Sequence, residues 1–124
     1  MSFQITATCH CGTVEITGHA PEGYASVARC DCSFCKRRQA ANIDVLSDTL
    51  KITKGADNLE LYTFGTHKAR HCFCKTCGIY THHQRFSNPA MSGVNIGCIA
   101  DTHPPDHEPI PWRNGRSDPA GKLD

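Results

Sequence analysis

The cysteines are the residues of this sequence whose types and spacing could do chemistry. Nine occur in 124 residues, and eight of them fall into three short clusters. The clusters and one isolated cysteine are Cys9 and Cys11; Cys30, Cys32 and Cys35; Cys72, Cys74 and Cys77; and Cys98. No export signal is visible in the first twenty residues, so we expect reduced thiols. Because an odd count also leaves one cysteine unpaired in any disulfide scheme, the pattern favours metal binding.

The first and third clusters predict a closed structural zinc site. Such a site needs four ligands in a tetrahedron, normally two from each of two tight turns. Each cluster contains such a turn, followed by a glycine that lets backbone N–H groups point at the sulfurs. We therefore expect one all-thiolate zinc site formed by four cysteines, Cys9, Cys11, Cys74 and Cys77. The alternatives are unliganded buried cysteines and a redox pair at Cys74 and Cys77.

The middle cluster predicts a different kind of site. Cys30, Cys32 and Cys35 can hold one metal from three sides, and no fourth ligand follows nearby. A zinc with three protein ligands and a vacant fourth position is typical of catalytic sites. Three thiolates favour a soft, exchangeable fourth ligand such as a substrate thiolate, which remains a nucleophile toward an aldehyde carbon. The alternatives are a second structural zinc completed by Cys98, Cys72 or a histidine, and a metal-free redox cluster.

Three adjacent cations, Lys36, Arg37 and Arg38, follow the middle cluster. They could stabilise the thiolates or hold carboxylates of a substrate. The alternative is that they form the solvated face of a short helix. The eight histidines are less informative, and the pattern assigns no single one of them a ligand or catalytic role.

Short β-strands must position these clusters. Apolar and polar residues alternate over short runs between turn residues, and helical turns are expected only within residues 33–39. We expect a turn at residues 18–23. We expect strands at residues 3–8, 13–17, 24–29, 42–46, 50–53, 59–64, 68–73, 78–82 and 93–99. Strands at this spacing predict a mainly β fold.

The length predicts one domain with a distinct C-terminal segment. Five of the seven prolines fall between Pro104 and Pro119. We assign residues 1–103 to a zinc-binding domain and residues 104–124 to a Pro-rich strap of the same domain. We expect Trp112 to pin the strap and the chain to fray after Ser117.

Charge and hydropathy exclude several classes of partner. Thirteen basic residues against 12 acidic ones leave a net charge of +1, which argues against a strong non-specific grip on nucleic acid or an anionic membrane. No apolar run approaches the roughly 18 residues that a membrane span needs. We expect a cytoplasmic protein without nucleic-acid or membrane partners, and exposed strand edges could support a homodimer.

The three clusters, in this order, resemble the glutathione-dependent formaldehyde-activating enzyme family, also called the centromere protein V family. The resemblance spans residues 4–101 and rests on seven cysteines at matching spacings, with support from residues 61–64 and 95–101. It implies a β-tent fold of short, coiled antiparallel sheets held by zinc knuckles. It also implies a structural zinc held by the first and third knuckles, on Cys9, Cys11, Cys74 and Cys77. The middle knuckle would hold a catalytic zinc, on Cys30, Cys32 and Cys35.

The resemblance implies a function as well. The family's named reaction joins formaldehyde to glutathione and gives S-hydroxymethylglutathione, which is carbon–sulfur lyase chemistry. We therefore expect an enzyme with two zinc ions per chain that acts on a small thiol, above all glutathione, and on formaldehyde or a related aldehyde adduct. Lys36, Arg37 or Arg38 would hold a carboxylate of the thiol. The alternative is a non-catalytic zinc-stapled module that binds or carries a thiol or contacts another protein.

Overall fold

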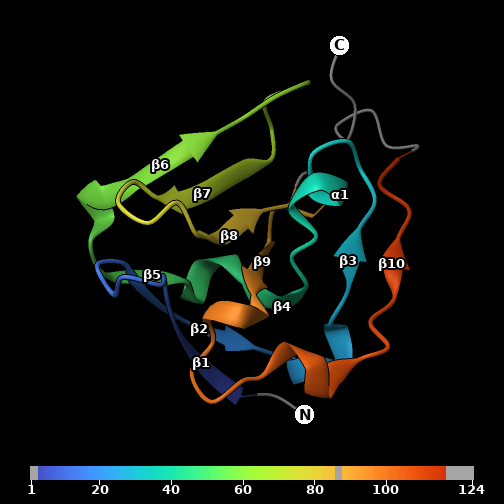
Figure 1. The fold of residues 1–124 in the computed structure, drawn as a ribbon, viewed down its shortest axis with the longest axis horizontal. Helices are drawn as coiled ribbons and strands as arrows, with labels where there is room; N and C mark the ends of the chain where they lie inside the picture. Colours follow the sequence, from blue (N-terminus) through green and yellow to red (C-terminus); the bar gives the residue numbers. More distant parts are fainter. Residues whose placement is uncertain (1–2, 86–87, 117–124) are drawn as a thin grey trace.

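The computed structural model describes residues 3–85 and 88–116, which form three β-sheets (Figure 1). The largest is antiparallel, with five strands in the order β4-β9-β8-β7-β6. In chain order its strands are β4 (Asn42–Leu46), β6 (Leu59–Tyr62), β7 (Arg70–Cys74), β8 (Tyr80–Gln84) and β9 (Met91–Asn95). The turn between β7 and β8 carries Cys77, so this hairpin positions the third cluster.

Two smaller sheets carry the other clusters. The three-stranded antiparallel sheet has the order β1-β2-β5, and the first cluster lies in the loop between β1 and β2. A two-stranded parallel sheet pairs β10 with β3, and the one short α-helix of the described residues, α1, follows β3. The bounds of these elements are β1 (Phe3–Thr8), β2 (Glu15–Ala20), β3 (Arg29–Cys30), α1 (Cys35–Arg38), β5 (Lys51–Lys54) and β10 (Trp112–Arg113). The middle cluster therefore runs from the end of β3 to the start of α1.

The apolar core joins the three-stranded sheet to β4 and β9. Its largest fully buried side chains are aliphatic, each stabilising the fold by about 1.5–3 kcal/mol through burial, and they include Ile16, Ile43, Val45, Val94 and Ile96. A Cβ on Gly18 of β2 would lie 2.6 Å from Cγ1 of Val45, so glycine is needed for this close approach. Cys9 and Cys74 belong to the same buried cluster, which makes the first and third cysteine turns continuous with the core.

The predicted mainly β, tent-like fold is confirmed, but three local predictions are wrong. The strand predicted at residues 93–99 ends at Asn95, because residues 96–98 form a 3-10 turn. Residues 18–23 do not form a turn from their start, because β2 continues to Ala20 in register with Phe3. Residues 24–29 do not form one strand, because residues 23–26 form a 3-10 turn. The hydroxyl of Ser26 donates to the carbonyl oxygen of Gly23 at 3.0 Å and accepts the backbone N–H of Asp44 at 2.9 Å, which holds this turn.

The strap is anchored at a different residue from the one predicted. Ile110 is 5% exposed and packs into the core, and Glu108 forms an ion pair with Arg29 at 3.1 Å. Trp112 is 50% exposed, with the guanidinium carbon of Arg29 5.9 Å from its ring centroid. The apolar anchor is therefore Ile110, because the tryptophan ring stays half in solvent.

Two further sequence predictions concern the end of the chain and membrane-spanning segments. The fraying predicted after Ser117 lies outside the described residues. Among the residues that the structure describes, no helix is long and apolar enough to cross a membrane.

Candidate metal centres

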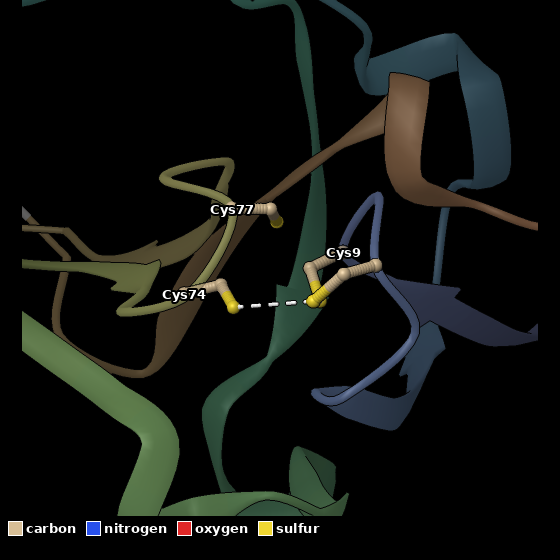
Figure 2. Close-up of side chains that lie close together, drawn as sticks. Cys9, Cys74 and Cys77 are labelled. Carbon is tan, nitrogen blue, oxygen red and sulfur yellow. Dashed lines mark hydrogen bonds between the residues drawn. The ribbon is translucent and has the colours of Figure 1, made fainter.

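The first and third cysteine clusters meet in space, although Cys11 and Cys74 are 63 positions apart. The four sulfurs lie within 4.8 Å of one another, and the Cys9–Cys11 and Cys11–Cys74 pairs are each 3.7 Å apart. Zinc–thiolate bonds of about 2.3 Å in a tetrahedron place the sulfurs about 3.8 Å apart. Figure 2 shows Cys9 on one turn opposite Cys74 and Cys77 on the other. This geometry fits a tetrahedral site with four thiolates.

The two turns of this group share one local construction. Gly12 and Gly78 have φ values of 80° and 77°, a left-handed conformation in which a Cβ would be strained. Their N–H groups donate to the carbonyl oxygens of Cys9 at 3.2 Å and Cys74 at 2.9 Å. In each turn another backbone N–H donates to the sulfur of the first cysteine at 3.3 Å. Such bonds stabilise the thiolate, which is the metal-binding form.

Local hydrogen bonds also separate the pKa values of these thiols. Backbone N–H groups of Cys11 and Ile79 lower the pKa of Cys77 to about 6. The side chain and backbone of Thr13 lower the pKa of Cys11, whereas burial raises the pKa of Cys9. Two of the four sulfurs are thereby biased toward the thiolate, which favours capture of a cation.

The middle cluster forms a second group of close sulfurs. The Sγ atoms of Cys30, Cys32 and Cys35 lie within 4.8 Å of one another. The backbone N–H of Cys35, where α1 begins, donates to Sγ of Cys32 at 3.2 Å. Arg38, at the other end of α1, donates through Nη2 to Sγ of Cys35 at 3.2 Å. Within residues 3–85 and 88–116, no fourth sulfur, imidazole nitrogen or carboxylate oxygen joins this group at that mutual distance.

These three thiols differ strongly in acidity. Hydrogen bonds from the thiols of Cys30 and Cys35 lower the pKa of Cys32 to about 2. Hydrogen bonds with Cys30 and Cys32 raise the pKa of Cys35, opposed by the guanidinium of Arg38. The cluster therefore concentrates negative charge on one sulfur, and a divalent cation would neutralise it and displace the shared protons.

The other two cysteines lie apart from both groups, and all nine are free thiols. Cys98 is 8% exposed in the core, and its thiol donates to the carbonyl oxygen of Tyr80 at 3.5 Å. Cys72 is partly buried on β7, opposite Leu61 and His82. Burial raises the pKa of both thiols. Neither joins the middle cluster, so a closed second zinc site lacks its fourth ligand among the described residues.

A cavity of about 250 Å³ lies beside the middle cluster, and all three cysteines line it. Phe64 and His71 form a stacked aromatic part of its wall, with ring centroids 5.7 Å apart. Asp44, Arg85 and Arg113 form a charged part, in which Asp44 pairs with Arg85 at 3.2 Å and with Arg113 at 3.5 Å. The cavity thus combines soft metal ligands, an apolar wall and charged groups.

Of the three cations predicted to bind substrate, the structure turns only Arg38 toward the middle cluster. Its guanidinium carbon lies 3.6 Å from the ring centroid of Tyr80, and Nη1 donates to Nδ1 of His71 at 3.2 Å. Lys36 and Arg37 are exposed and do not line the cavity. The structure therefore brings Arg38 to the cysteines and leaves the other two cations on the surface of α1.

Sequence reasoning missed the polar side chains of the cavity wall. No spacing links them, because they come from different strands and from the strap: Asp44, His71, His83, Arg85 and Arg113. Burial lowers the pKa of His71 to about 4, so its ring is neutral at pH 7. Because arginine only donates, Nδ1 of His71 accepts the bond from Arg38, and the ring proton lies on Nε2.

Comparisons with known proteins agree with the cysteine pattern. A family model described as glutathione-dependent formaldehyde-activating enzyme matches residues 4–111 of the chain. The structure is also similar to the crystal structure of a Rhodobacter sphaeroides protein, with a TM-score of 0.85 and 50% sequence identity. That match covers 87% of this chain and 99% of the other. Because the family model spans most of the sequence, the protein belongs to the glutathione-dependent formaldehyde-activating enzyme family.

Proposed function

We propose that the protein is a zinc-dependent enzyme of the carbon–sulfur lyase type. Its substrates would be a small thiol, above all glutathione, and formaldehyde or a related aldehyde adduct. The observation that carries this proposal is the group of three cysteines, which has no fourth protein ligand among the described residues and lines a cavity. Membership of the family supports glutathione-dependent activation of formaldehyde in general terms.

Both cysteine groups fit zinc, because their sulfurs are soft ligands at the mutual distances that a tetrahedral ion requires. One ion would be structural and the other catalytic, giving two per chain: Cys9, Cys11, Cys74 and Cys77 would hold the first, and Cys30, Cys32 and Cys35 the second. When bound to the three-cysteine group, zinc would acidify a thiol that enters its vacant position.

The side chains around the cavity would orient the reactants. Arg38 donates a hydrogen bond to the sulfur of Cys35 and would offset the charge of that sulfur as a metal-bound thiolate, and its stacking on Tyr80 fixes the guanidinium in place. The aromatic wall of Phe64 and His71 would limit the access of water to a substrate sulfur bound at the three cysteines. The cavity would thus hold a thiol close to the aldehyde carbon while keeping both partly dry.

The reaction itself makes one bond and moves one proton. The thiol sulfur forms a bond to the aldehyde carbon, the carbonyl π bond breaks, the thiol loses its proton and the former carbonyl oxygen gains one. The reverse reaction breaks the carbon–sulfur bond and returns thiol and aldehyde. Neutral His71, with its proton on Nε2, would donate a hydrogen bond to that oxygen from the cavity wall.

The proposal is tested by using NMR to measure the rate of exchange between free formaldehyde and S-hydroxymethylglutathione. This rate is compared with that of the rapid uncatalysed exchange in buffer. We expect the zinc-loaded protein to increase the exchange rate. Cys32→Ser should return the rate to that of buffer because it removes one of three ligands. The matched control is Cys72→Ser, a cysteine outside both groups, which should keep the wild-type rate.

Two outcomes would contradict the proposed enzyme activity. Glutathione binding without any increase in exchange rate would instead support a thiol carrier. An increase that persists in Cys32→Ser would show that the middle cluster does not carry the reaction.

A further inference from the structure

The part of the cavity wall formed by arginine and aspartate side chains carries excess positive charge. Apart from the cysteines, this wall carries three arginines and one carboxylate: Arg29, Arg85, Arg113 and Asp44. Arg29 is balanced by its ion pair with Glu108. Arg85 and Arg113 share Asp44, at 3.2 Å and 3.5 Å. Because one carboxylate balances only one guanidinium, this part of the wall retains one net positive charge.

This charged group is partly withdrawn from water. The exposed side-chain fractions are 16% for Asp44, 24% for Arg85 and 43% for Arg113. Partly buried charges are screened less by water and salt than fully exposed ones. A guanidinium can also bind a carboxylate through two parallel N–H···O bonds. A carboxylate that enters the cavity therefore meets partners of complementary charge and geometry.

The backbone of Arg113 is fixed beside the middle cluster. Arg113 pairs with Cys30 in the parallel ladder of β10 and β3, where neighbouring strands lie about 4.8 Å apart. The carbonyl oxygen of Arg113 accepts the N–H of Asp31 at 3.2 Å. Its Nη2 donates to the carbonyl oxygen of Ser26, also at 3.2 Å. A group bound by this guanidinium would therefore lie in the same cavity as the three cysteines.

We propose that Arg85 and Arg113 form a carboxylate-binding subsite of this cavity. This inference rests on the thiol-binding function proposed above and names the substrate class: thiols that carry a carboxylate near the sulfur, in preference to neutral thiols. Arg113 lies beyond residue 111, where the match to the family model ends, so the strap of this chain supplies half of the subsite. In this proposal the carboxylate of the substrate binds to the cavity wall and not to the exposed side chains of Lys36 and Arg37.

Two matched thiols, 3-mercaptopropionate and 3-mercaptopropionamide, test the subsite because they differ in a single charge. Their binding to the zinc-loaded protein is measured by titration calorimetry. We expect the carboxylate thiol to bind about tenfold more tightly than the amide, since a hydrogen-bonded charge pair typically contributes that much. Arg113→Gln and Arg85→Gln should each remove most of this preference without changing the affinity for the amide.

Arg70→Gln is the matched control, because it removes the same charge at an exposed position of β7 outside the cavity wall. Each test variant leaves Asp44 one arginine partner, and unchanged melting temperature and zinc content would show that the fold is kept. Equal binding of the two thiols by the wild type, or a preference retained in both arginine variants, would overturn the subsite and leave the proposed function standing. Binding of neither thiol, while glutathione binds, would overturn the subsite alone. Binding of no thiol, glutathione included, would overturn the proposed function and the subsite with it.

Discussion

Gly115 of the strap packs against Cys30 of β3 so closely that a Cβ on Gly115 would overlap with the Cys30 sulfur. The same Cβ would lie 3.1 Å from Cβ and 3.2 Å from the backbone nitrogen of Cys32. Oδ1 of Asp31 accepts the backbone N–H groups of Gly115 and Arg116 at 2.8 Å and 2.9 Å. The strap and the middle cluster are therefore packed as one unit.

This packing predicts that Gly115→Ala disturbs the middle cluster selectively. The added methyl group must displace either the strap or the sulfur of Cys30, so we expect the zinc content to fall from two ions per chain to one. Native mass spectrometry measures the stoichiometry. Gly97→Ala is the control, because a Cβ there meets nothing closer than 3.4 Å and should leave both ions bound. Two zinc ions in Gly115→Ala would show that the strap does not constrain the cluster.

The two cysteine groups should differ in their effect on folding. Cys74→Ser should unfold or aggregate the protein, because Cys74 is fully buried in the core and structural zinc binding contributes folding free energy, about 10–16 kcal/mol in small zinc peptides. Cys32→Ser should leave a folded domain, since its cluster borders a cavity. Thermal unfolding followed by circular dichroism compares them. Equal losses of melting temperature would make the middle cluster structural.

Removal of metal should proceed in two stages. The three-cysteine group has no fourth protein ligand among the described residues, so a zinc ion held there would keep one position open to a chelator, whereas an ion held by the four-cysteine group would be enclosed. We expect a short treatment with chelator to remove one zinc while the far-ultraviolet spectrum stays unchanged, and a longer treatment to remove the second and unfold the chain. Simultaneous loss of both ions would contradict two sites of different kinds.

Acid should destabilise the fold through a buried histidine. Burial lowers the pKa of His82 from 6.5 to about 4, so between these values the unfolded chain binds a proton that the folded chain does not. The stability from neutral His82 is present above pH 6.5 and is lost as the pH falls toward 4. From about pH 7.5 to about pH 5, the wild type should lose about 2 kcal/mol more than His82→Gln.

Urea unfolding with saturating zinc at the two pH values measures this difference, because both proteins then share the pH dependence of the metal sites. Equal losses in the two proteins would mean that His82 keeps an ordinary pKa in the folded state.

The sequence predicted those features that depend on local chemistry. The cysteine turns could be read directly, because C-x-C-G and C-x-x-C-G place two sulfurs and a glycine within one turn. The joining of Cys9 and Cys11 to a distant turn followed from the need for four ligands. The mainly β fold followed from alternation over short runs, as in residues 3–8, which form β1.

Features that depend on strand register could not be predicted in this way. Asp44, Arg85 and Arg113 meet only because β4, the end of β8 and β10 lie around one cavity. The anchor of the strap was misjudged for a related reason. Trp112 has the larger apolar ring, but Ile110 occupies the position that points into the core.

The most direct test of two different zinc sites is native mass spectrometry of the reduced protein titrated with glutathione. The structure and the proposed function predict two zinc ions per chain and a saturable glutathione adduct that is absent in Cys32→Ser. A single zinc ion, or a glutathione adduct that forms equally well in Cys32→Ser, would contradict an open catalytic centre at the middle cluster.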